Sequence, residues 1–417
     1  MNDASTIPKF VVDLSLPPEN RYNHVIPHFR DSVTDCDLPS LFDELLESIA
    51  GPRYGKALAA VARYTLRRVH SAEETAELTG ISRAIGIPMH ILVAFNVLLD
   101  LLLGCTSGGV RTLFMGGTGK STRILHFRTL DWGMEQLRQI IVELDFVRFT
   151  GGPVIATAVT YLGYVGVLTG VRKGLSMSLN FRPYHAQDTH WQKFSFRWNQ
   201  AMVVLGFRQS ISSTLRKFLL NPSSDSDQQP EKSQETNINS SDSVSDQYIE
   251  NVLTKLSTSN STAAYLIFCQ PNRIYIVEKD HKSANIRESD TFLTAYNHDV
   301  KDEEDPSRLQ EAVATLAEGE DATGMADLVG LSLSRNHHLQ GHWRKRVRAC
   351  QRKYKQRDDV VTMSDVIGFL EHEEISNPET HYAVIMDPEE GKVIWRRQYE
   401  VESESGSGDS SSIAEGV

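Results

Sequence analysis

One cysteine lies where the sequence pattern changes from helical to strand-like, and charged residues near it could make its thiol reactive. Cys105 follows Gly104 in LLLGCTSGG, between an apolar helical pattern and a series of strand patterns. The next strand pattern ends in HFRTLD, so an antiparallel hairpin would bring Arg128 and Asp131 beside Cys105. A cation beside a thiol lowers the thiol pKa and favours the reactive thiolate. Asp131 would orient an amine and Arg128 would steady an anion. This arrangement indicates a nucleophilic cysteine.

Simpler explanations exist for the same residues. A lone cysteine commonly behaves as a small buried hydrophobic residue. Arg128 and Asp131 would also suit an ordinary salt bridge at a strand end, an interaction that is common and weak when exposed. Residue types and spacing alone leave these alternatives open.

The segment GGTGKST at residues 116–122 has the look of a phosphate-binding loop. That motif requires a glycine five residues before its Gly-Lys pair, and Phe114 occupies this position. The residues after Ser121 alternate between apolar and polar types and are rich in β-branched side chains, which predicts a strand. Without a following helix, no helix N-terminus faces a phosphate. We therefore interpret the segment as a hairpin turn and expect no nucleotide.

The elements around this hairpin follow two periodicities. Before residue 104, apolar residues recur at three- and four-residue spacing, which predicts helices at 38–51, 54–70, 71–86 and 88–104 after an extended start. After Cys105 the pattern becomes that of strands joined by short glycine-bearing turns. The predicted strands are 110–115, 122–130, 139–149, 153–162, 163–171 and 174–181.

The second half of the chain repeats this mixture. A helix is predicted at 197–220, and the Ser/Asp/Gln/Asn tract at 221–248 has the composition of a flexible insertion. Strand patterns return at 263–269, 273–279 and 291–297, followed by two or three helices, a hairpin at 380–399 and a Ser/Gly/Glu tail at 401–417 expected to be disordered. Helices flanking mainly antiparallel strands predict a layered α+β fold.

Composition excludes some classes of function. The 417 residues have a net charge of -11, but the segment 222–247 has six acids against one lysine and the tail has four acids and no basic residue. The remainder is nearly neutral, which argues against a nucleic-acid-binding protein. Four widely spaced cysteines indicate neither a disulfide framework nor a zinc ribbon. The N-terminus lacks the pattern of a signal peptide, and the apolar run 91–103 is too short to span a bilayer, so we expect a soluble intracellular protein.

Five segments, taken together and in order, resemble one known family. They are VVDLSLPPENRY, IGIPMHILVAFNVLLDLLLGCTS, HFRTLDWG, GYVGVLTGVRKGLSMSLN and AYNHD, and the resemblance runs from about residue 8 to 398. This pattern is similar to that of the acid ceramidase and N-acylethanolamine acid amidase family. These proteins belong to the N-terminal nucleophile hydrolases, which include cholylglycine hydrolases.

The resemblance implies a fold and a processing event. The expected fold is an αββα sandwich with an N-terminal helical segment, 1–104, and a catalytic domain, 105–417. In the family, the precursor cuts its own backbone directly before the nucleophilic cysteine, which here implies the bond between Gly104 and Cys105. The freed α-amine, with an ordinary pKa near 8, would act as general base for its own thiol.

The resemblance also assigns roles to other residues. Arg128 and Asp131 match the arginine and aspartate after the first hairpin of the family, with Asp131 holding the cysteine amine. Asn297, in AYNHD, matches an asparagine that helps to form the oxyanion hole. Arg344, in HWRKRVRAC, aligns with an arginine near the active site. No metal and no cofactor are implied.

The implied activity is hydrolysis of a fatty-acyl amide, with ceramide as the leading substrate. N-acylethanolamines, bile-salt conjugates and penicillin-type amides remain within the same class. Two departures from the family, Phe181 in place of a glutamate and the lack of a signal peptide, keep a non-catalytic lipid-binding descendant open. The family is typically lysosomal, which gives the alternative compartment.

Two further patterns deserve a prediction. The basic run 344–357 places four of its residues on one helical face: Arg344, Arg348, Arg352 and Lys355. This face indicates either a solvated helix or transient contact with anionic lipid. His337 and His338 are adjacent, which is poor geometry for joint metal binding, and no partner set with metal-ligand spacing appears. The sequence therefore predicts no metal site.

Overall fold

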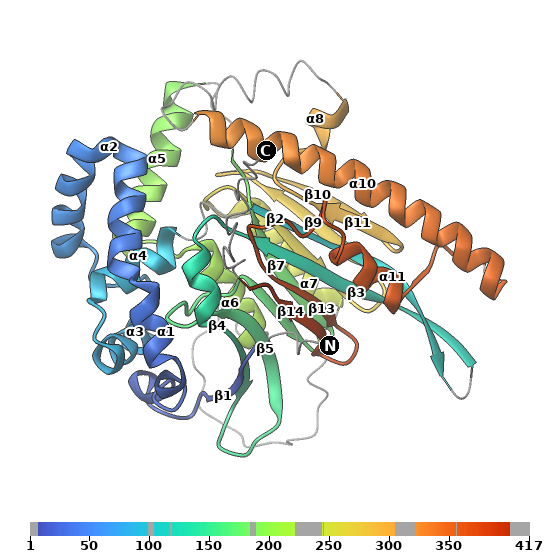
Figure 1. Cartoon of the computed structure of the whole chain (residues 1–417), viewed down its shortest axis with the longest axis horizontal. Coiled ribbons are helices and arrows are strands. Elements are labelled where there is room, and N and C mark those ends of the chain that lie inside the picture. Colours follow the sequence, from blue (N-terminus) through green and yellow to red (C-terminus); the bar gives the residue numbers. More distant parts are fainter. Residues whose placement is uncertain are drawn as a thin grey trace, which may run out of the picture.

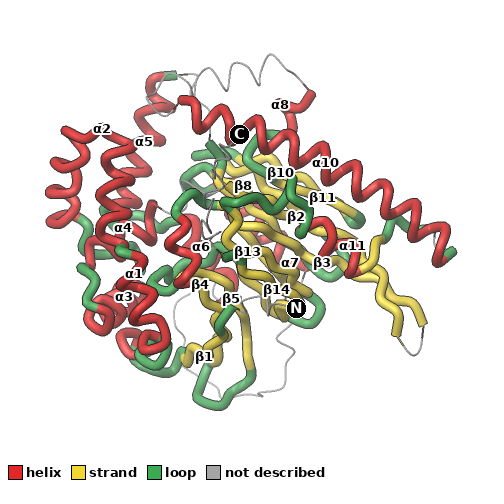
Figure 2. The backbone as a smooth tube through the Cα atoms, in the orientation of Figure 1, coloured by secondary structure: helices red, strands yellow, loops and turns green. Residues whose placement is uncertain are grey.

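The computed structural model describes residues 7–98, 104–116, 119–183, 189–221, 244, 246–304, 322–355 and 357–400. Two stacked β-sheets lie between helices, with a helical group beside them formed by the N-terminal part of the chain (Figure 1). Figure 2 shows the same arrangement, with the strands inside and the helices outside. The predicted α+β class and the αββα order of layers are confirmed.

The larger sheet has eight strands, and most of its residues are buried on both faces. Its strands run antiparallel, except that β1 pairs in parallel with β4. In spatial order they are β1 (Lys9–Asp13), β4 (Ile141–Val147), β5 (Val154–Tyr161), β6 (Thr169–Arg172), β7 (Leu175–Phe181), β8 (Ala264–Cys269), β9 (Ile274–Lys279) and β10 (Ala284–Ser289).

The smaller, six-stranded sheet carries the long hairpin. In spatial order its strands are β11 (Phe292–Ala295), β2 (Gly104–Gly116), β3 (Gly119–Asp131), β13 (Thr380–Asp387) and β14 (Lys392–Gln398), with β12 (Val361–Thr362) paired to β2. In the hairpin, Gly116 pairs with Gly119. The predicted strand after GGTGKST is therefore confirmed as β3, and residues 117 and 118 of the turn lie outside the described residues.

Helices cover the outer faces of both sheets. On the larger sheet lie α6 (Ile211–Leu220), against β5–β7, and α7 (Asp246–Thr258), against β9 and β10. On the smaller sheet lie α10 (Ala322–Tyr354) and α11 (Met363–Leu370), which share a hydrophobic cluster with β2, β3 and β13. Other helices in the part of the chain that the structure describes are α5 (His190–Val204), α8 (Val300–Glu304), η1 (Pro18–Asn20), η2 (Ile26–Phe29) and η4 (Glu135–Ile140).

The N-terminal part is mainly helical, as predicted. It contains α1 (Arg30–Cys36), α2 (Leu38–Thr65), α3 (Ala72–Ile85) and α4 (Met89–Leu98). Within α2, Gly51 adopts φ 74° and ψ 159°, a conformation that favours glycine and that bends the helix into the two halves expected from the sequence. No helix among the described residues is both long enough and apolar enough to cross a bilayer.

Three predicted elements need correction. The single helix expected at 197–220 is two helices, α5 and α6, because Gly206 takes a positive φ of 72° between them. The insertion expected at 221–248 ends earlier than predicted, since α7 begins at Asp246. Residues 222–243 and 245 lie outside the described residues. Strand β10 was not predicted, because its mostly polar sequence ANIRES carries no strong strand pattern.

The N-terminal part is bound to the rest of the protein by buried charges. Glu77 on α3 accepts hydrogen bonds from Arg216 on α6, at 2.5 and 2.7 Å, and from Arg21, at 2.8 Å. On β1, the Lys9 ammonium lies 2.8 Å from carboxylate oxygens of both Glu143 and Asp145 on β4. The pair of Glu77 with Arg216 is buried, and removing one partner of such a pair costs about 3–5 kcal/mol. The Lys9 side chain is 44% exposed, so its ion pairs contribute less.

Candidate active site

The candidate nucleophile, Cys105, lies at the second position of β2 and is fully buried. Its backbone N–H donates to Oδ1 of Asn297 at 3.0 Å. Its Sγ lies 4.0 Å from the carbonyl oxygen of Leu179 on β7. The bond expected to be cut, between Gly104 and Cys105, therefore lies where β2 enters the smaller sheet and faces the larger one.

Arg128 reaches the thiol from the neighbouring strand. Because Ser107 pairs with Arg128 in the hairpin, the Arg128 side chain points to the same face of the sheet as Cys105. Its Nη2 lies 3.3 Å from the Cys105 Sγ and donates to the Leu179 carbonyl at 2.8 Å. Its Nη1 donates to Thr169 Oγ1 at 2.8 Å and to the Leu168 carbonyl. The larger sheet thus holds the guanidinium against the sulfur.

Asp131 projects to the opposite face of the smaller sheet. It stands three residues after Arg128, and strand side chains alternate between faces. Its carboxylate accepts hydrogen bonds from Arg335 Nη1 on α10 and from Thr380 Oγ1 on β13, both at 2.7 Å. In the uncut chain the Cys105 amide therefore contacts Asn297 directly. Asp131 is connected to this amide through Arg335, which donates to both Asp131 and Asn297.

Asn297 joins the two faces of the site. Its Oδ1 accepts from both the Cys105 N–H and Arg335 Nη2, each at 3.0 Å. Its Nδ2 donates to the carbonyl of Phe181 at 2.9 Å, and its own N–H donates to Ser332 Oγ at 2.8 Å. To serve an oxyanion, Asn297 would donate from Nδ2, the same atom that donates to the Phe181 carbonyl.

Burial controls the protonation of the central groups. It raises the pKa of the Cys105 thiol, and the nearby Arg128 guanidinium opposes this rise only in part. The expectation of a thiol pKa lowered by Arg128 is therefore wrong for the uncut chain, because desolvation of the thiolate outweighs the attraction of the cation. Burial also raises the pKa of the Asp131 carboxyl, against the opposing effect of Arg335. The thiol is held neutral until a base takes its proton.

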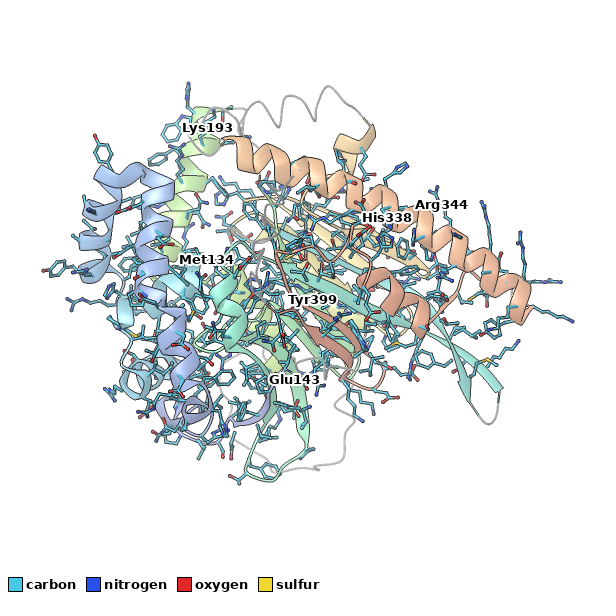
Figure 3. The ribbon with its side chains drawn as sticks, in the orientation of Figure 1. Met134, Glu143, Lys193, His338, Arg344 and Tyr399 are labelled. Atoms are coloured by element: carbon cyan, nitrogen blue, oxygen red, sulfur yellow. The ribbon has the colours of Figure 1, made fainter. Side chains whose placement is uncertain are left out.

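Arg344 is not part of this cluster, which corrects the sequence-based assignment. It is exposed on α10 and lines a surface hollow with Lys345, Arg348 and Arg352 (Figure 3). Arg335 provides the arginine of the site instead. The two residues lie nine positions apart on α10, which amounts to about two and a half helical turns, so they face opposite sides.

Sequence reasoning also missed residues that support the site. Asn180 on β7 accepts from Ser107 Oγ at 2.7 Å and donates to the Ala295 carbonyl at 3.0 Å. Asn180 is the last residue of the segment GYVGVLTGVRKGLSMSLN, and the resemblance of that segment to the family could have pointed to it. Arg335 gave no such signal, because the polar sequence LSRNHHLQGHWRKR does not indicate which arginine faces the sheet.

Phe181 occupies the position where the resemblance leads one to expect a glutamate. It is the last residue of β7, its side chain is buried, and its carbonyl receives the hydrogen bond from Asn297. The residue therefore contributes its backbone to the site, and its side chain adds no carboxylate.

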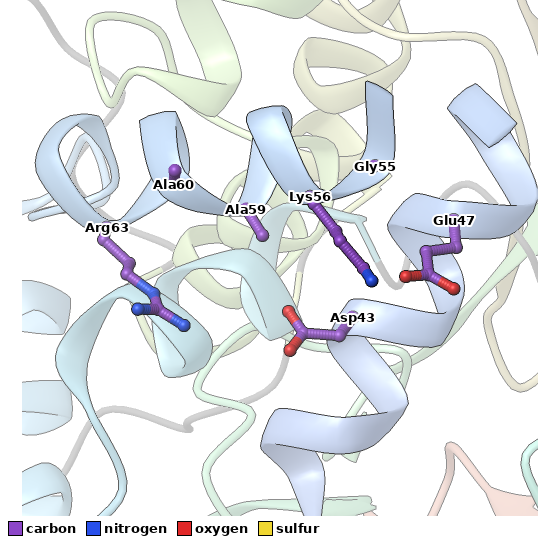
Figure 4. Close-up of a pocket in the computed structure, with 7 residues that line it drawn as sticks. All are labelled: Asp43, Glu47, Gly55, Lys56, Ala59, Ala60 and Arg63. Atoms are coloured by element: carbon purple, nitrogen blue, oxygen red, sulfur yellow. The ribbon is translucent and has the colours of Figure 1, made fainter. Parts of the chain in front are cut away.

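A separate hollow of about 290 Å³ opens between the two halves of α2. Figure 4 shows Lys56 and Arg63 from one half facing Asp43 and Glu47 from the other. Its lining mixes both signs of charge on one helix of the N-terminal part. It contains none of the residues that surround Cys105, so we do not assign it to the active site.

Comparison with known proteins gives three kinds of match. The family model described as the beta subunit of N-acylethanolamine-hydrolyzing acid amidase matches residues 5–70. The N-acylethanolamine-hydrolyzing acid amidase of Caenorhabditis elegans is 32% identical over 184 residues, covering 42% of this chain and 47% of that protein. The acid ceramidases of Rattus norvegicus and Homo sapiens are each 27% identical, over 210 and 206 residues, covering 42% of this chain and 46% of those proteins.

A solved structure of a Caenorhabditis elegans N-acylethanolamine-hydrolyzing acid amidase ortholog is also similar. It has a TM-score of 0.42 and 20% sequence identity, covering 68% of this chain and 93% of that chain. The chain spans about half the length of the curated relatives it matches.

Proposed function

Since this chain is a relative of the acid ceramidases and N-acylethanolamine acid amidases, we propose that it is a self-processing amidohydrolase of fatty-acyl amines. One observation carries the proposal. A buried cysteine directly after a glycine has an arginine on its sulfur, Arg128 at 3.3 Å, and an asparagine oxygen on its nitrogen, Asn297 at 3.0 Å. Because both the nitrogen and the sulfur of Cys105 have a defined partner, the arrangement suits a mechanism that uses both atoms.

In the first step the chain cuts itself. The Cys105 Sγ gives its proton to a base and attacks the Gly104 carbonyl carbon. The base then passes this proton to the Cys105 nitrogen as the C–N bond breaks, leaving a thioester on sulfur and a free α-amine on Cys105. Water hydrolyses the thioester to a Gly104 carboxylate and restores the thiol. Arg128 stabilises the negative charge on sulfur during the attack.

In the second step the new α-amine serves as the base. It takes the thiol proton, and the sulfur attacks the carbonyl carbon of the substrate amide. The proton passes to the leaving amine, and water then releases the fatty acid from the acyl-thioester. Asn297 Oδ1, which already accepts from the Cys105 nitrogen, would hold the amine, and Asp131 would position Asn297 through Arg335.

Within this class we propose ceramide as the leading substrate, cleaved to a sphingoid base and a fatty acid. N-acylethanolamine hydrolysis is the principal alternative, because the chain matches an N-acylethanolamine-hydrolyzing acid amidase and an acid ceramidase at similar identity, 32% and 27%. Phe181 supports a second candidate, a non-catalytic lipid-binding descendant, because it removes a carboxylate that the resemblance leads one to expect.

A panel of amides would decide between these candidates. We expect the purified chain, tested after self-cleavage, to release amine and fatty acid from N-acylsphingosine at least about tenfold faster than from N-acylethanolamines, bile-salt conjugates or penicillins. Mass spectrometry of both products provides the measurement. A cleaved chain that binds these lipids but hydrolyses none would favour the lipid-binding descendant, and a faster N-acylethanolamine reaction would change the substrate.

We also propose transient contact with a membrane surface, through α5. Trp191, Phe194 and Trp198 on this helix are 79%, 58% and 52% exposed. Their rings contact in series, with centroids 6.1 and 6.3 Å apart. Exposed aromatic side chains grouped on one helix are typical of interfacial helices.

Changing both Trp191 and Phe194 to serine is expected to weaken binding to phospholipid vesicles by at least about tenfold, since each buried aromatic side chain contributes about 1.5–3 kcal/mol. Vesicle co-sedimentation measures this. Phe149→Ser, at a single exposed aromatic residue outside α5, is the matched control and should leave binding unchanged. Equal binding by all three proteins would argue against contact through α5.

A further inference from the structure

Three imidazoles that are scattered in the sequence meet on the outer side of the smaller sheet. His338 and His342 lie on α10, and His372 lies two residues after the end of α11. Their ring centroids are 4.2 Å apart for His338 and His342, 4.0 Å for His338 and His372, and 5.0 Å for His342 and His372. One ring nitrogen from each lies within 4.8 Å of the others. Figure 3 labels His338 on α10.

Two packed elements hold these rings together. His338 and His342 are four residues apart, so they project from the same face of the helix. Leu339 and Val347 on α10 share a hydrophobic cluster with Phe369 and Leu370 on α11. The His372 carbonyl accepts from the N–H groups of Ile375 and Ser376, both at 2.8 Å, which fixes the turn that carries the third ring. The cluster is therefore set by the fold and does not depend on flexible side chains alone.

The local chemistry leaves ring nitrogens available for a cation. His338 Nε2 is a buried atom with no hydrogen-bond partner among the described residues. Partial burial lowers the pKa of His338 and of His342, and the neighbouring imidazoles lower both further. Neutral imidazole is the form that binds a metal ion. Burying a ring nitrogen without a partner costs free energy, and a bound ion would supply that partner.

One existing contact must change when an ion binds. His372 Nδ1 accepts a hydrogen bond from the Glu374 N–H at 3.3 Å, a long and weak bond. An ion on Nδ1 would replace this bond, and an ion on Nε2 would move the ring proton to Nδ1. The Glu374 carboxylate lies close enough to His338 to favour a positive charge there.

We propose that His338, His342 and His372 form a binding site for a transition-metal ion of the zinc class. Imidazole ligands suit Zn²⁺, Cu²⁺ and Ni²⁺ better than Mg²⁺ or Ca²⁺, and three histidines leave one position for water or for a carboxylate. The ion would join α10 to the turn after α11. Because His338 follows Arg335 by three residues, the ion would also fix the part of α10 that supports the active site.

The test measures zinc binding where Cys105 cannot contribute. Cys105→Ala removes the active-site thiol, which could itself bind zinc, and isothermal titration with ZnCl₂ of this protein is expected to give about one equivalent. His342→Gln and His372→Gln, each in the same background, should weaken the affinity at least tenfold. His337→Gln is the matched control, because His337 is the exposed neighbour of His338 on the same helix and should not affect binding.

A second readout follows structure. With zinc at 100 times its dissociation constant, the melting temperature of the background protein and of His337→Gln is expected to rise by about 3 °C, and that of His342→Gln or His372→Gln should not rise. Circular dichroism before titration confirms that each variant is folded. Failure of the background protein to bind zinc, or equal binding by the His342 and His372 variants, would overturn the proposal.

Discussion

Cys105→Ala is expected to remain one intact chain and to have no measurable amidase activity. The wild-type chain should separate on a denaturing gel into fragments 1–104 and 105–417 under mildly acidic conditions. The alanine variant lacks the only sulfur that lies against Arg128 among the described residues, so neither the self-cleavage nor the acyl transfer can begin. Gel mobility and the product assay on N-acylsphingosine measure the two losses separately.

Cys269→Ala is the matched control for this experiment. Cys269 is also fully buried, on β8, and burial raises the pKa of its thiol. It should cut itself and hydrolyse substrate at close to the wild-type rate. A wild-type chain that stays whole, or an alanine variant at position 105 that is cut at the same bond, would refute the self-processing mechanism.

Arg335→Gln is expected to lower kcat by about 100-fold or more while KM changes little. Arg335 joins Asp131 to Asn297, so its removal takes away one of the hydrogen bonds that position the asparagine contacting the Cys105 nitrogen. The loss expected for a misplaced polar group at an active site is of this size. Arg335→Lys should recover part of the activity, because an ammonium can still reach the carboxylate but cannot bridge both partners. Steady-state kinetics on the preferred amide gives both constants.

The structure offers a sharp control on the same helix. Arg344→Gln removes the arginine that the sequence pointed to, and since Arg344 is exposed we expect kcat to stay within about twofold of wild type. Arg335→Gln also leaves Asp131 without a buried cation, at a cost of about 3–5 kcal/mol, so circular dichroism must show that the variant is folded. Comparable losses in both variants would assign the effect to the net charge of α10.

The centre of the candidate site could be predicted because it rests on local pairing. A hairpin with a two-residue tip fixes its register, so Gly116 opposite Gly119 places Ser107 opposite Arg128 and Gly104 opposite Asp131. Because side chains alternate between the two faces of a strand, Arg128 and Asp131, three residues apart, lie on opposite faces of the sheet. This consequence was available from the sequence, although it requires knowing that helices cover one face and a second sheet covers the other.

The rest depends on contacts between distant segments. Arg335 and Arg344 both lie in a long polar stretch, and only the packing of α10 on the sheet decides which of them faces inward. His372 meets His338 and His342 because α11 packs against α10, which no spacing within either helix reveals. The thiol pKa was misjudged for a related reason: a sequence shows the neighbouring cation but does not show the depth at which both groups are buried.

The parallel pairing of β1 with β4 gives a backbone cut before Cys105 an unusual outcome. Strand β1 belongs to the N-terminal part, yet it forms the edge of the larger sheet, and Glu77 ties α3 to Arg216 on α6. The two products of the cut would therefore stay together as a split protein. Refolding would then require an encounter between two chains, whereas the uncut chain folds alone. Self-cleavage would convert a unimolecular folding reaction into a concentration-dependent one. The mature form would then arise most readily from a chain that folds before it is cut.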